Sequence, residues 1–242
     1  MNELKENKSI SFSGIYGIPE AAKVLSNTPP FTNGGHIDTT KLRYWIRTSV
    51  PYVAPSNYPT RQRLITFLDL ISMRMIAVMR SRGLKLRYIR NHEKWLKREF
   101  GIKFPFVSRE LWTCGSHVYM KFHDHLWASS KFGQQALEFI EGWLSKVELD
   151  MEFNEYDVAS AWHPIDDVCL NPKIQFGAPC INGTRIPTRT IWRKAKAGDS
   201  EEIIANLYGI SATQIEHALA WESRFENNGG KTVILARRTP QL

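Results

Sequence analysis

The chain contains 242 residues, of which 43% are hydrophobic, and it carries a formal net charge of +8 at pH 7. This length can hold one large domain or two small ones, each able to bury its own core. No apolar run of about 18 residues occurs and the N-terminus is polar, so neither a membrane helix nor a signal peptide is predicted, and a cytoplasmic location is expected.

The charge is unevenly distributed along the chain. Residues 1–100 contain 17 Lys/Arg against 7 Asp/Glu, residues 101–160 contain 5 against 9, and residues 161–242 contain 10 against 8. A strongly basic segment is typical of a nucleic-acid binder, although a solvated basic face is the alternative. The three cysteines, Cys114, Cys169 and Cys180, lack zinc-type spacing and are expected to be reduced structural thiols.

The first hundred residues predict a series of helices. An amphipathic helix is expected over residues 16–25, with Pro19 in its first turn, and a loop rich in Pro and Gly follows over residues 26–37. A second helix begins after Asp38 or Thr39 and contains residues 41–47. Residues 50–63 are then expected to form an extended wing.

Two further helices complete this segment. Thr66 and Asp69 are spaced as a capping box, with Asp in place of the usual Glu, and open a helix that continues to about Ser81. Another helix is predicted from Gly83 to Phe100.

This order resembles the winged helix-turn-helix of the MerR family over roughly residues 15–100. The segments that carry the resemblance are Ile18-Pro19-Glu20-Ala21-Ala22, Leu42-Arg43-Tyr44-Trp45, Phe67-Leu68-Asp69-Leu70 and Gly83-Leu84-Lys85-Leu86 with Ile89. The resemblance implies a DNA-binding domain.

DNA recognition by such a domain needs short polar side chains at the exposed start of the second helix and cations around it for phosphates. The expected DNA-binding residues of the second helix and the wing are Thr39, Thr40, Lys41, Arg43, Arg47, Arg61 and Arg63. Tyr44 could bond a phosphate, whereas Leu42 and Trp45 are expected in the core.

A run of nine cations follows, with Glu93 as its only acid. Its members are Arg74, Arg80, Arg82, Lys85, Arg87, Arg90, Lys94, Lys97 and Arg98. They form either a solvated face of two helices or a set of contacts with the DNA backbone, which would make binding strongly dependent on salt.

The middle of the chain predicts short strands. Residues 111–122 are expected to form a hairpin that turns near Gly115, and residues 147–153 alternate apolar and acidic side chains as a half-buried strand does. The sequence His123-Asp124-His125 is a weak metal motif, and no metal is expected there. No nucleophile with a base, phosphate loop or pair of catalytic carboxylates is found, so neither an enzyme nor a cofactor is expected.

The C-terminal part begins with turns and ends with helices. Short strands and tight turns are expected over residues 171–187, followed by helices over residues 191–197 and 200–208, with Ser200 as N-cap. A turn at residues 209–211 leads to a third helix through Phe225, which makes a helix-turn-helix pattern. Its first exposed positions, which would meet DNA, are Ser211, Thr213, Gln214 and His217.

One motif in this part is specific. Gly177, Pro179, Ile181 and the run Gly183-Thr184-Arg185-Ile186-Pro187 resemble the family catalogued as domain of unknown function 433. Either a phosphate contact or a structural brace of the turn would suit Arg185, and the structural role is preferred. Such domains resemble the VapB-like antitoxins that partner PIN-domain ribonucleases.

The end of the chain contains a breaker at residues 226–230 and a short apolar strip that ends in Arg237 and Arg238. The residues alone predict a terminal strand or a frayed end. The resemblance to VapB-like antitoxins implies instead that these two arginines bind the acidic metal site of a toxin.

We therefore expect a mainly α (α+β) fold in which two helix-turn-helix domains, the N-terminal one winged and MerR-like, are joined by a small β-containing segment. The expected divisions are a DNA-binding domain (1–100), a strand-containing linker and dimerisation segment (101–160), the second helix-turn-helix (161–225) and a toxin-binding tail (226–242). The expected function is that of a dimeric antitoxin that binds its own operator DNA and a PIN-domain toxin. The alternative is a MerR-like transcription regulator without a toxin.

Overall fold

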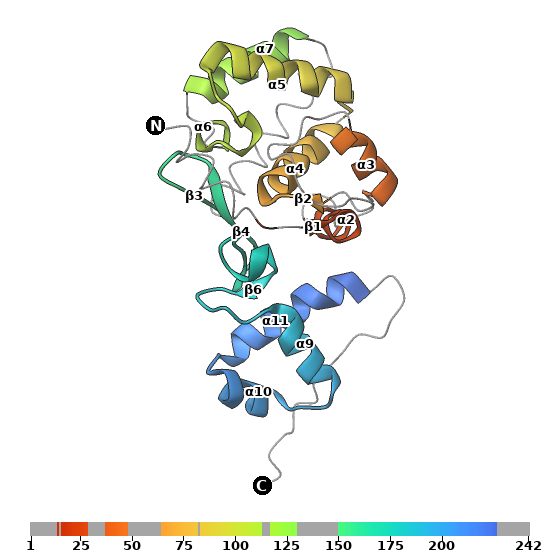
Figure 1. Ribbon diagram of the computed structural model, residues 1–242, viewed down its shortest axis with the longest axis vertical. Coiled ribbons are helices and arrows are strands. Elements are labelled where there is room, and N and C mark those ends of the chain that lie inside the picture. The colour runs from red at the N-terminus through yellow and green to blue at the C-terminus, as the bar shows by residue number, and fades with distance from the viewer. Residues whose placement is uncertain are drawn as a thin grey trace. The chain divides into compact units, whose positions relative to one another are not determined.

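The computed structural model describes residues 14, 16–28, 37–47, 64–81, 83–112, 117–129 and 150–226. The chain divides into two compact units, residues 1–162 and 163–242, which are described separately (Figure 1). Helices predominate in the described residues and the sheets are small, which confirms the predicted mainly α fold class. No helix in this part of the chain is long and apolar enough to cross a membrane.

The first unit begins with a helix pair tied to a short sheet. Strand β1 (Tyr16–Gly17) pairs antiparallel with β2 (Leu64–Ile65), and α2 (Ile18–Ser26) starts directly after β1. Pro19 lies in the first turn of α2, where a missing backbone N–H costs nothing. The second helix of the pair is α3 (Thr39–Arg47), so both predicted helices are present, although Tyr16 and Gly17, predicted to begin the first helix, form β1 instead.

Helix α4 (Phe67–Ser81) is the centre of the first unit, because nearly all of its side chains are buried. Its predicted capping box is confirmed. The backbone N–H of Thr66 donates to Asp69 Oδ2 (3.0 Å), and the N–H of Asp69 donates to Thr66 Oγ1 (3.1 Å). The shorter Asp side chain thus performs the part that Glu usually plays in this motif.

Helix α5 (Leu86–Phe100) packs against α4 and ends at Gly101, whose φ of 66° is the left-handed conformation of a helix C-cap. The 3₁₀ turn η1 (Pro105–Val107) is buried below it. Helix α5 confirms the predicted helix up to Phe100, although it begins at Leu86 and not at Gly83.

The hairpin predicted over residues 111–122 is wrong. The chain forms helix α6 (Arg109–Trp112) and then helix α7 (His117–Ser129), which packs against α5. Val118, Tyr119 and Phe122 are all residue types that favour strands, so local preference does not explain the helix. Burial of Phe122 against α5 therefore decides in favour of a helix.

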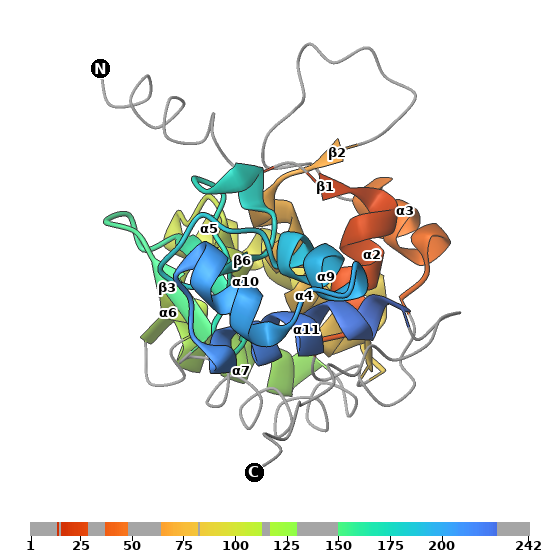
Figure 2. The same ribbon diagram turned by 90° about the horizontal axis from the view of Figure 1, so that it is seen from below.

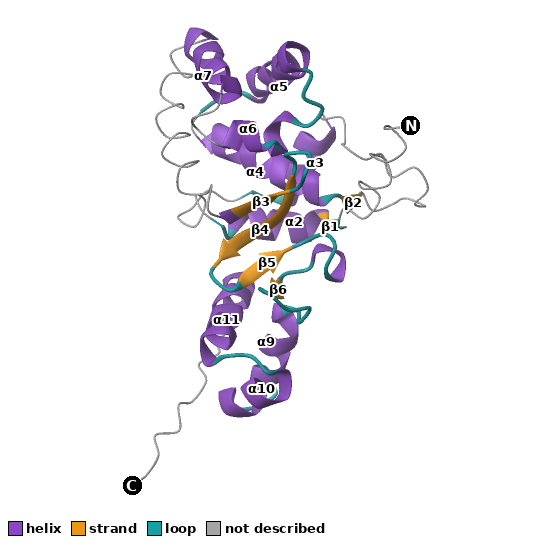
Figure 3. Ribbon diagram, turned by 90° about the vertical axis from the view of Figure 1, so that its left-hand side faces the viewer, coloured by secondary structure: helices purple, strands orange, loops and turns teal. Residues whose placement is uncertain are grey.

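Strands close the first unit. Strand β3 (Met151–Phe153) pairs antiparallel with β4 (Ala159–Ile165), as Figure 3 shows, and Met151 is buried while Glu152 is exposed. The alternation predicted for residues 147–153 is confirmed for this part, and its first residues lie outside the described range.

Arg74 of α4 is only 2% exposed and stacks on the Trp162 ring of β4 (4.3 Å), so its assignment to a surface cation run is wrong.

The second unit combines a short antiparallel pair with three helices. Strand β5 (Val168–Leu170) pairs with β6 (Cys180–Ile181), and the turn η3 (Gln175–Gly177) lies between them. The helices are α9 (Thr188–Lys196), α10 (Glu201–Tyr208) and α11 (Ala212–Glu226), which Figure 2 shows from below. They enclose a core of apolar side chains that includes Ile191, Ile204 and Ile215.

The turn between α10 and α11 follows the predicted helix-turn-helix pattern. Ser200 caps α10, since its Oγ accepts from the N–H of Ile203 (3.3 Å). Gly209 ends the helix with φ 63°, a conformation that favours glycine. Cys169 and Cys180 are buried thiols, and burial raises the pKa of the Cys180 thiol to about 11, so this thiol is unreactive at neutral pH.

Phe176 adopts a left-handed backbone (φ 55°, ψ 27°) although its side chain is 76% exposed. A left-handed conformation costs a non-glycine residue roughly 1–2 kcal/mol. We expect Phe176→Gly to raise the free energy of unfolding by about 1 kcal/mol, because relief of strain exceeds the added entropy of the unfolded chain. Urea denaturation followed by circular dichroism measures the change.

The matched control is Phe176→Ala, which removes the ring but keeps the strained backbone. It should leave the free energy of unfolding within about 0.5 kcal/mol of the parent value, as surface substitutions usually do. A glycine variant less stable than the alanine variant would show that the conformation is not strained.

Candidate nucleic-acid interface

The α2–α3 pair is held rigidly at the point where one helix ends and the other begins. Ser26 Oγ donates to the carbonyl of Ile37, and the N–H of Ile37 donates back to Ser26 Oγ, both at 3.0 Å. Asp38 Oδ1 accepts from the N–H of Lys41 (2.7 Å), as an N-cap does. These bonds fix the start of α3 relative to α2.

One face of α3 is apolar and buried, and the other is polar and exposed. Leu42, Trp45 and Ile46 point into the core, which confirms the prediction for Leu42 and Trp45. The exposed side chains of the opposite face are Thr40, Lys41, Arg43, Tyr44 and Arg47. This face contains three cations, of which Lys41 forms a long ion pair with the N-cap Asp38 (3.9 Å), so its net charge is positive.

Most of the predicted DNA-binding residues therefore lie together on α3, although Thr39 is half-buried. Arg47 also lies over the Tyr44 ring, 5.9 Å from its centre. The wing over residues 50–63, including Arg61 and Arg63, lies outside the described residues, as do Arg237 and Arg238 of the tail.

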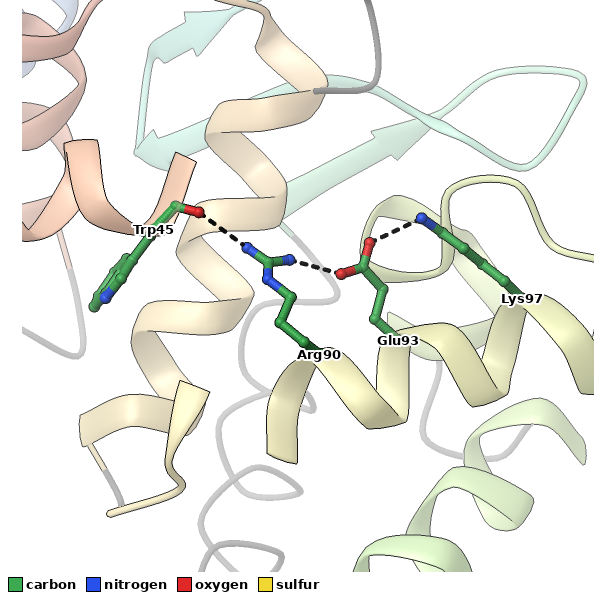
Figure 4. A network of polar contacts seen from close by, with 4 residues as sticks. All are labelled: Trp45, Arg90, Glu93 and Lys97. Carbon is green, nitrogen blue, oxygen red and sulfur yellow. Dashed lines mark hydrogen bonds and ion pairs between the residues drawn. The ribbon is translucent and has the colours of Figure 1, made fainter. Parts of the chain in front are cut away.

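Helix α5 braces the C-terminal end of α3, as Figure 4 shows. Arg90 Nη2 donates to the carbonyl of Trp45 (3.4 Å), and Arg90 Nη1 bonds Glu93 Oε2 (2.6 Å). Lys97 Nζ bonds the other Glu93 oxygen (3.0 Å). A cation at the C-terminal carbonyls of a helix is favourable, so this network both positions α3 and stabilises it.

The same network removes two members of the predicted cation run from the free surface. Arg90 and Lys97 bond Glu93, and Arg74 is buried. The cations of this run that remain exposed on α5 and its N-cap are Lys85, Arg87, Lys94 and Arg98. The described part of this run therefore offers fewer exposed cations than the nine counted in the sequence.

A group of aromatic rings fills the contact between α5 and α7. His92 is only 2% exposed and neither ring nitrogen has a hydrogen-bond partner among the described residues. Its ring lies 4.8 Å from His125, which packs on Trp95 at 4.1 Å. Burial, and to a smaller extent the neighbouring His125, lowers the pKa of His92 to about 4, so His92 is neutral at pH 7.

The His123-Asp124-His125 motif splits in the structure. His123 contacts Asp124 (3.4 Å), whereas His125 faces the aromatic group. In the described part of the chain, no three His, Cys, Asp or Glu side chains converge on a point that could hold a metal ion.

In the second unit, the turn that carries the Gly-Thr-Arg motif is held by Thr184. Its Oγ1 donates to the carbonyl of Ile181 (2.8 Å) and accepts from the N–H of Ile186 (3.1 Å). Gly183 has φ 74°, which favours glycine. The Arg185 side chain is exposed and has no hydrogen bond or ion pair among the described residues, so Thr184, and not the arginine, braces the turn.

Side chains at the start of α11 are largely occupied. The N–H of Ser211 donates to Gln214 Oε1 and the N–H of Gln214 donates to Ser211 Oγ, both at 3.1 Å. His217 Nδ1 lies 2.8 Å from Asp167 Oδ2. Three of the four positions predicted to meet DNA therefore serve local structure, and Thr213 alone of them has no such role in the described residues.

A buried pair that no sequence signal revealed joins α9 to α11. Thr188 Oγ1 donates to Glu222 Oε1 (2.6 Å), and both residues are buried. Arg189 approaches the other oxygen of the same carboxylate at 3.9 Å. The pair fixes how α9 lies on α11.

Comparison with known proteins identifies part of the second unit. Residues 168–221 match the family described as "Protein of unknown function (DUF433)", which confirms the resemblance of the motif at residues 177–187. Among solved structures, the crystal structure of Rv2018 from Mycobacterium tuberculosis is similar, with a TM-score of 0.65 and 19% identity. The match covers 84% of this chain and 96% of Rv2018, and it indicates a shared fold. No curated protein matches the chain.

Proposed function

We propose that this protein is the antitoxin of a type II toxin–antitoxin system, which binds its own operator DNA and silences a PIN-domain ribonuclease. The observation that carries the DNA-binding part is the exposed face of α3, where Thr40, Lys41, Arg43, Tyr44 and Arg47 lie together. Polar and cationic side chains on one helix suit base edges and phosphates.

The N-terminal domain would act as a MerR-like winged helix-turn-helix, in which Arg61 and Arg63 are the proposed wing cations. A homodimer is proposed because two-fold operators favour two-fold proteins. A cytoplasmic location and duplex DNA as a partner follow from the same proposal.

The antitoxin part is supported by the DUF433 match and by the basic tail. Arg237 and Arg238 end a short apolar strip, and charge-assisted bonds from arginine to carboxylates are among the strongest that proteins make. The acidic metal site of a PIN-domain ribonuclease is a target of suitable charge for them.

Growth of cells that express the adjacent reading frame tests the antitoxin. We expect the neighbour alone to stop growth and co-expression of this protein to restore it. Alanine at both Arg237 and Arg238 should abolish the rescue, because the charge-assisted bonds are lost, while circular dichroism shows an unchanged fold.

Alanine at Lys103 and Lys121, two exposed cations of the first unit, is the matched control and should preserve the rescue. A harmless neighbour would refute the antitoxin and favour a MerR-like transcription regulator without a toxin, since the α3 face suits both. Rescue that survives loss of both tail arginines would place the toxin contact elsewhere.

A further inference from the structure

The second unit is divided into a basic half and an acidic half. Residues 168–198, which form the β5–β6 pair and α9, contain six Lys/Arg and no Asp/Glu. Residues 199–226, which form α10 and α11, contain six Asp/Glu and only Arg224 as a cation. The nearly balanced charge of the whole C-terminal segment conceals this division.

Three of the four cations of α9 lie on one face, and the fourth, Lys194, pairs with Asp199 (3.4 Å). Thr188, Ile191, Trp192 and Ala195 are buried, while the exposed side chains of α9 are Arg189, Arg193 and Lys196. These three residues occupy positions i, i+4 and i+7 of a helix, so they form a single row along it. Two cations that are four residues apart are separated by about 6 Å along the helix axis. Together with Arg185 in the preceding turn, they are named the α9 stripe.

The stripe is available to a partner. The side chains of Arg185 and Arg193 form no hydrogen bond or ion pair with any residue that the structure describes, and Lys196 lies over the Trp192 ring (5.1 Å). Arg189 is 67% exposed at its side chain, and its ion pair with Glu222 is long at 3.9 Å. Long exposed pairs of this kind hold a side chain weakly.

The chemistry of the stripe favours a nucleic-acid backbone over a protein. A protein interface has an apolar core within a polar rim. On α9, by contrast, every exposed side chain is a cation, and no apolar side chain is exposed. Two exposed apolar side chains, Ile203 and Leu207, lie on α10 in the acidic half, and a third, Phe176, lies in the turn η3 and not on α9. Rows of Arg and Lys without apolar neighbours are typical of phosphate contacts.

The usual docking mode of a helix-turn-helix does not suit this unit. That mode places the helix after the turn in the major groove, and here this helix is α11. Its first turns carry an exposed acid, Glu216, and Ser211, Gln214 and His217 are engaged locally. The phosphates of DNA would repel the acidic half, which contains α10 and α11, and would attract the basic half, which contains α9.

We propose that the second unit contacts duplex DNA through the α9 stripe, with Arg185, Arg189, Arg193 and Lys196 on the phosphate backbone, and not through the start of α11. The inference rests on the proposed DNA binding of the whole protein. It assigns the C-terminal unit a role that is independent of base sequence, because phosphate contacts hold a duplex without reading it.

The dependence of binding on salt tests the stripe in the full-length protein. The probe is a random-sequence 30-base-pair DNA duplex, titrated by fluorescence anisotropy over a range of NaCl concentrations. Each phosphate contact contributes about 0.9 to the slope of log K against log salt. Arg185→Gln with Arg193→Gln is therefore expected to make the slope shallower by about 1.8.

Two matched variants accompany it. Lys103→Gln with Lys121→Gln removes the same charge from exposed positions of the first unit and should leave the slope unchanged. Thr213→Ala with Glu216→Gln alters the start of α11 and should also leave it unchanged. Thermal melting checks that every variant retains its fold.

The outcomes separate the two proposals. If the parent protein binds no DNA, the DNA-binding function itself fails and the stripe inference fails with it. If the parent binds but the stripe variant keeps the parent slope, only the stripe inference is overturned, and the cations would serve an acidic protein partner instead. A gain in affinity confined to the α11 variant would show that this helix, and not α9, faces the phosphates.

Discussion

Replacing Arg43 and Arg47 of α3 with glutamine is expected to lower the affinity for operator DNA by about 100-fold or more. Each good contact between an arginine and a base edge contributes about 1–3 kcal/mol, and 1.4 kcal/mol is a factor of ten. Both side chains are exposed on the polar face, opposite the buried Leu42 and Trp45. The substitution therefore removes contacts without disturbing the core.

Anisotropy titrations with a duplex from the region upstream of the protein's own reading frame measure this loss. Glutamine at Lys103 and Lys121 is the matched control and should retain affinity within about threefold, because each exposed charge acts mainly through long-range attraction. A retained fold, checked by circular dichroism, is required of both variants. Parent-like affinity of the α3 variant would remove α3 from the interface and leave the wing or the second unit to carry binding.

Local sequence signals predicted the helices well. Proline at the start of α2, the Thr66–Asp69 box before α4, Ser200 before α10 and Gly209 after it all act within a few residues, and each appears in the structure as expected. Such signals are readable because caps and turns are satisfied by their own neighbours in sequence. The spacing of apolar residues along α3 likewise predicted which of its faces is polar and exposed.

Features that depend on distant partners were not predictable. Residues 117–129 are helical because Phe122 and His125 pack against α5, a contact that no local pattern shows. Arg74 looks like a surface cation until Trp162, far along the chain, covers it. Arg90, which bonds a carbonyl of α3, is a similar case.

The candidate site in the second unit was missed for another reason. Its cations were visible in the sequence, but a count over residues 161–242 averages the basic half with the acidic half. Only the burial of Ile191, Trp192 and Ala195 shows that Arg189, Arg193 and Lys196 share one face. Likewise, the capping bond of Ser211 and Gln214 shows why the start of α11 is a poor DNA contact.

The first unit is expected to lose about 3 kcal/mol of stability between pH 6.5 and pH 4 through His92 alone. Burial lowers the pKa of His92 from 6.5 to about 4, so the folded protein keeps this ring neutral where the unfolded chain has already protonated it. Because the unfolded state binds more protons in this window, the free energy of unfolding falls as pH falls. Above pH 6.5 His92 is neutral in both the folded and the unfolded state, so its contribution to the free energy of unfolding is constant.

Urea denaturation at a series of pH values, for the parent and for His92→Phe, isolates this contribution. Phenylalanine fills a similar volume between Phe122 and His125 and does not titrate, so the free energy of its unfolding should fall by about 3 kcal/mol less over the same window. Titrating groups that do not contact His92 are common to both proteins and cancel in the difference. A parent and variant with the same pH dependence would show that His92 is hydrated or bonded in the folded state. In that case α7 would not pack on α5 tightly enough to exclude water from the ring.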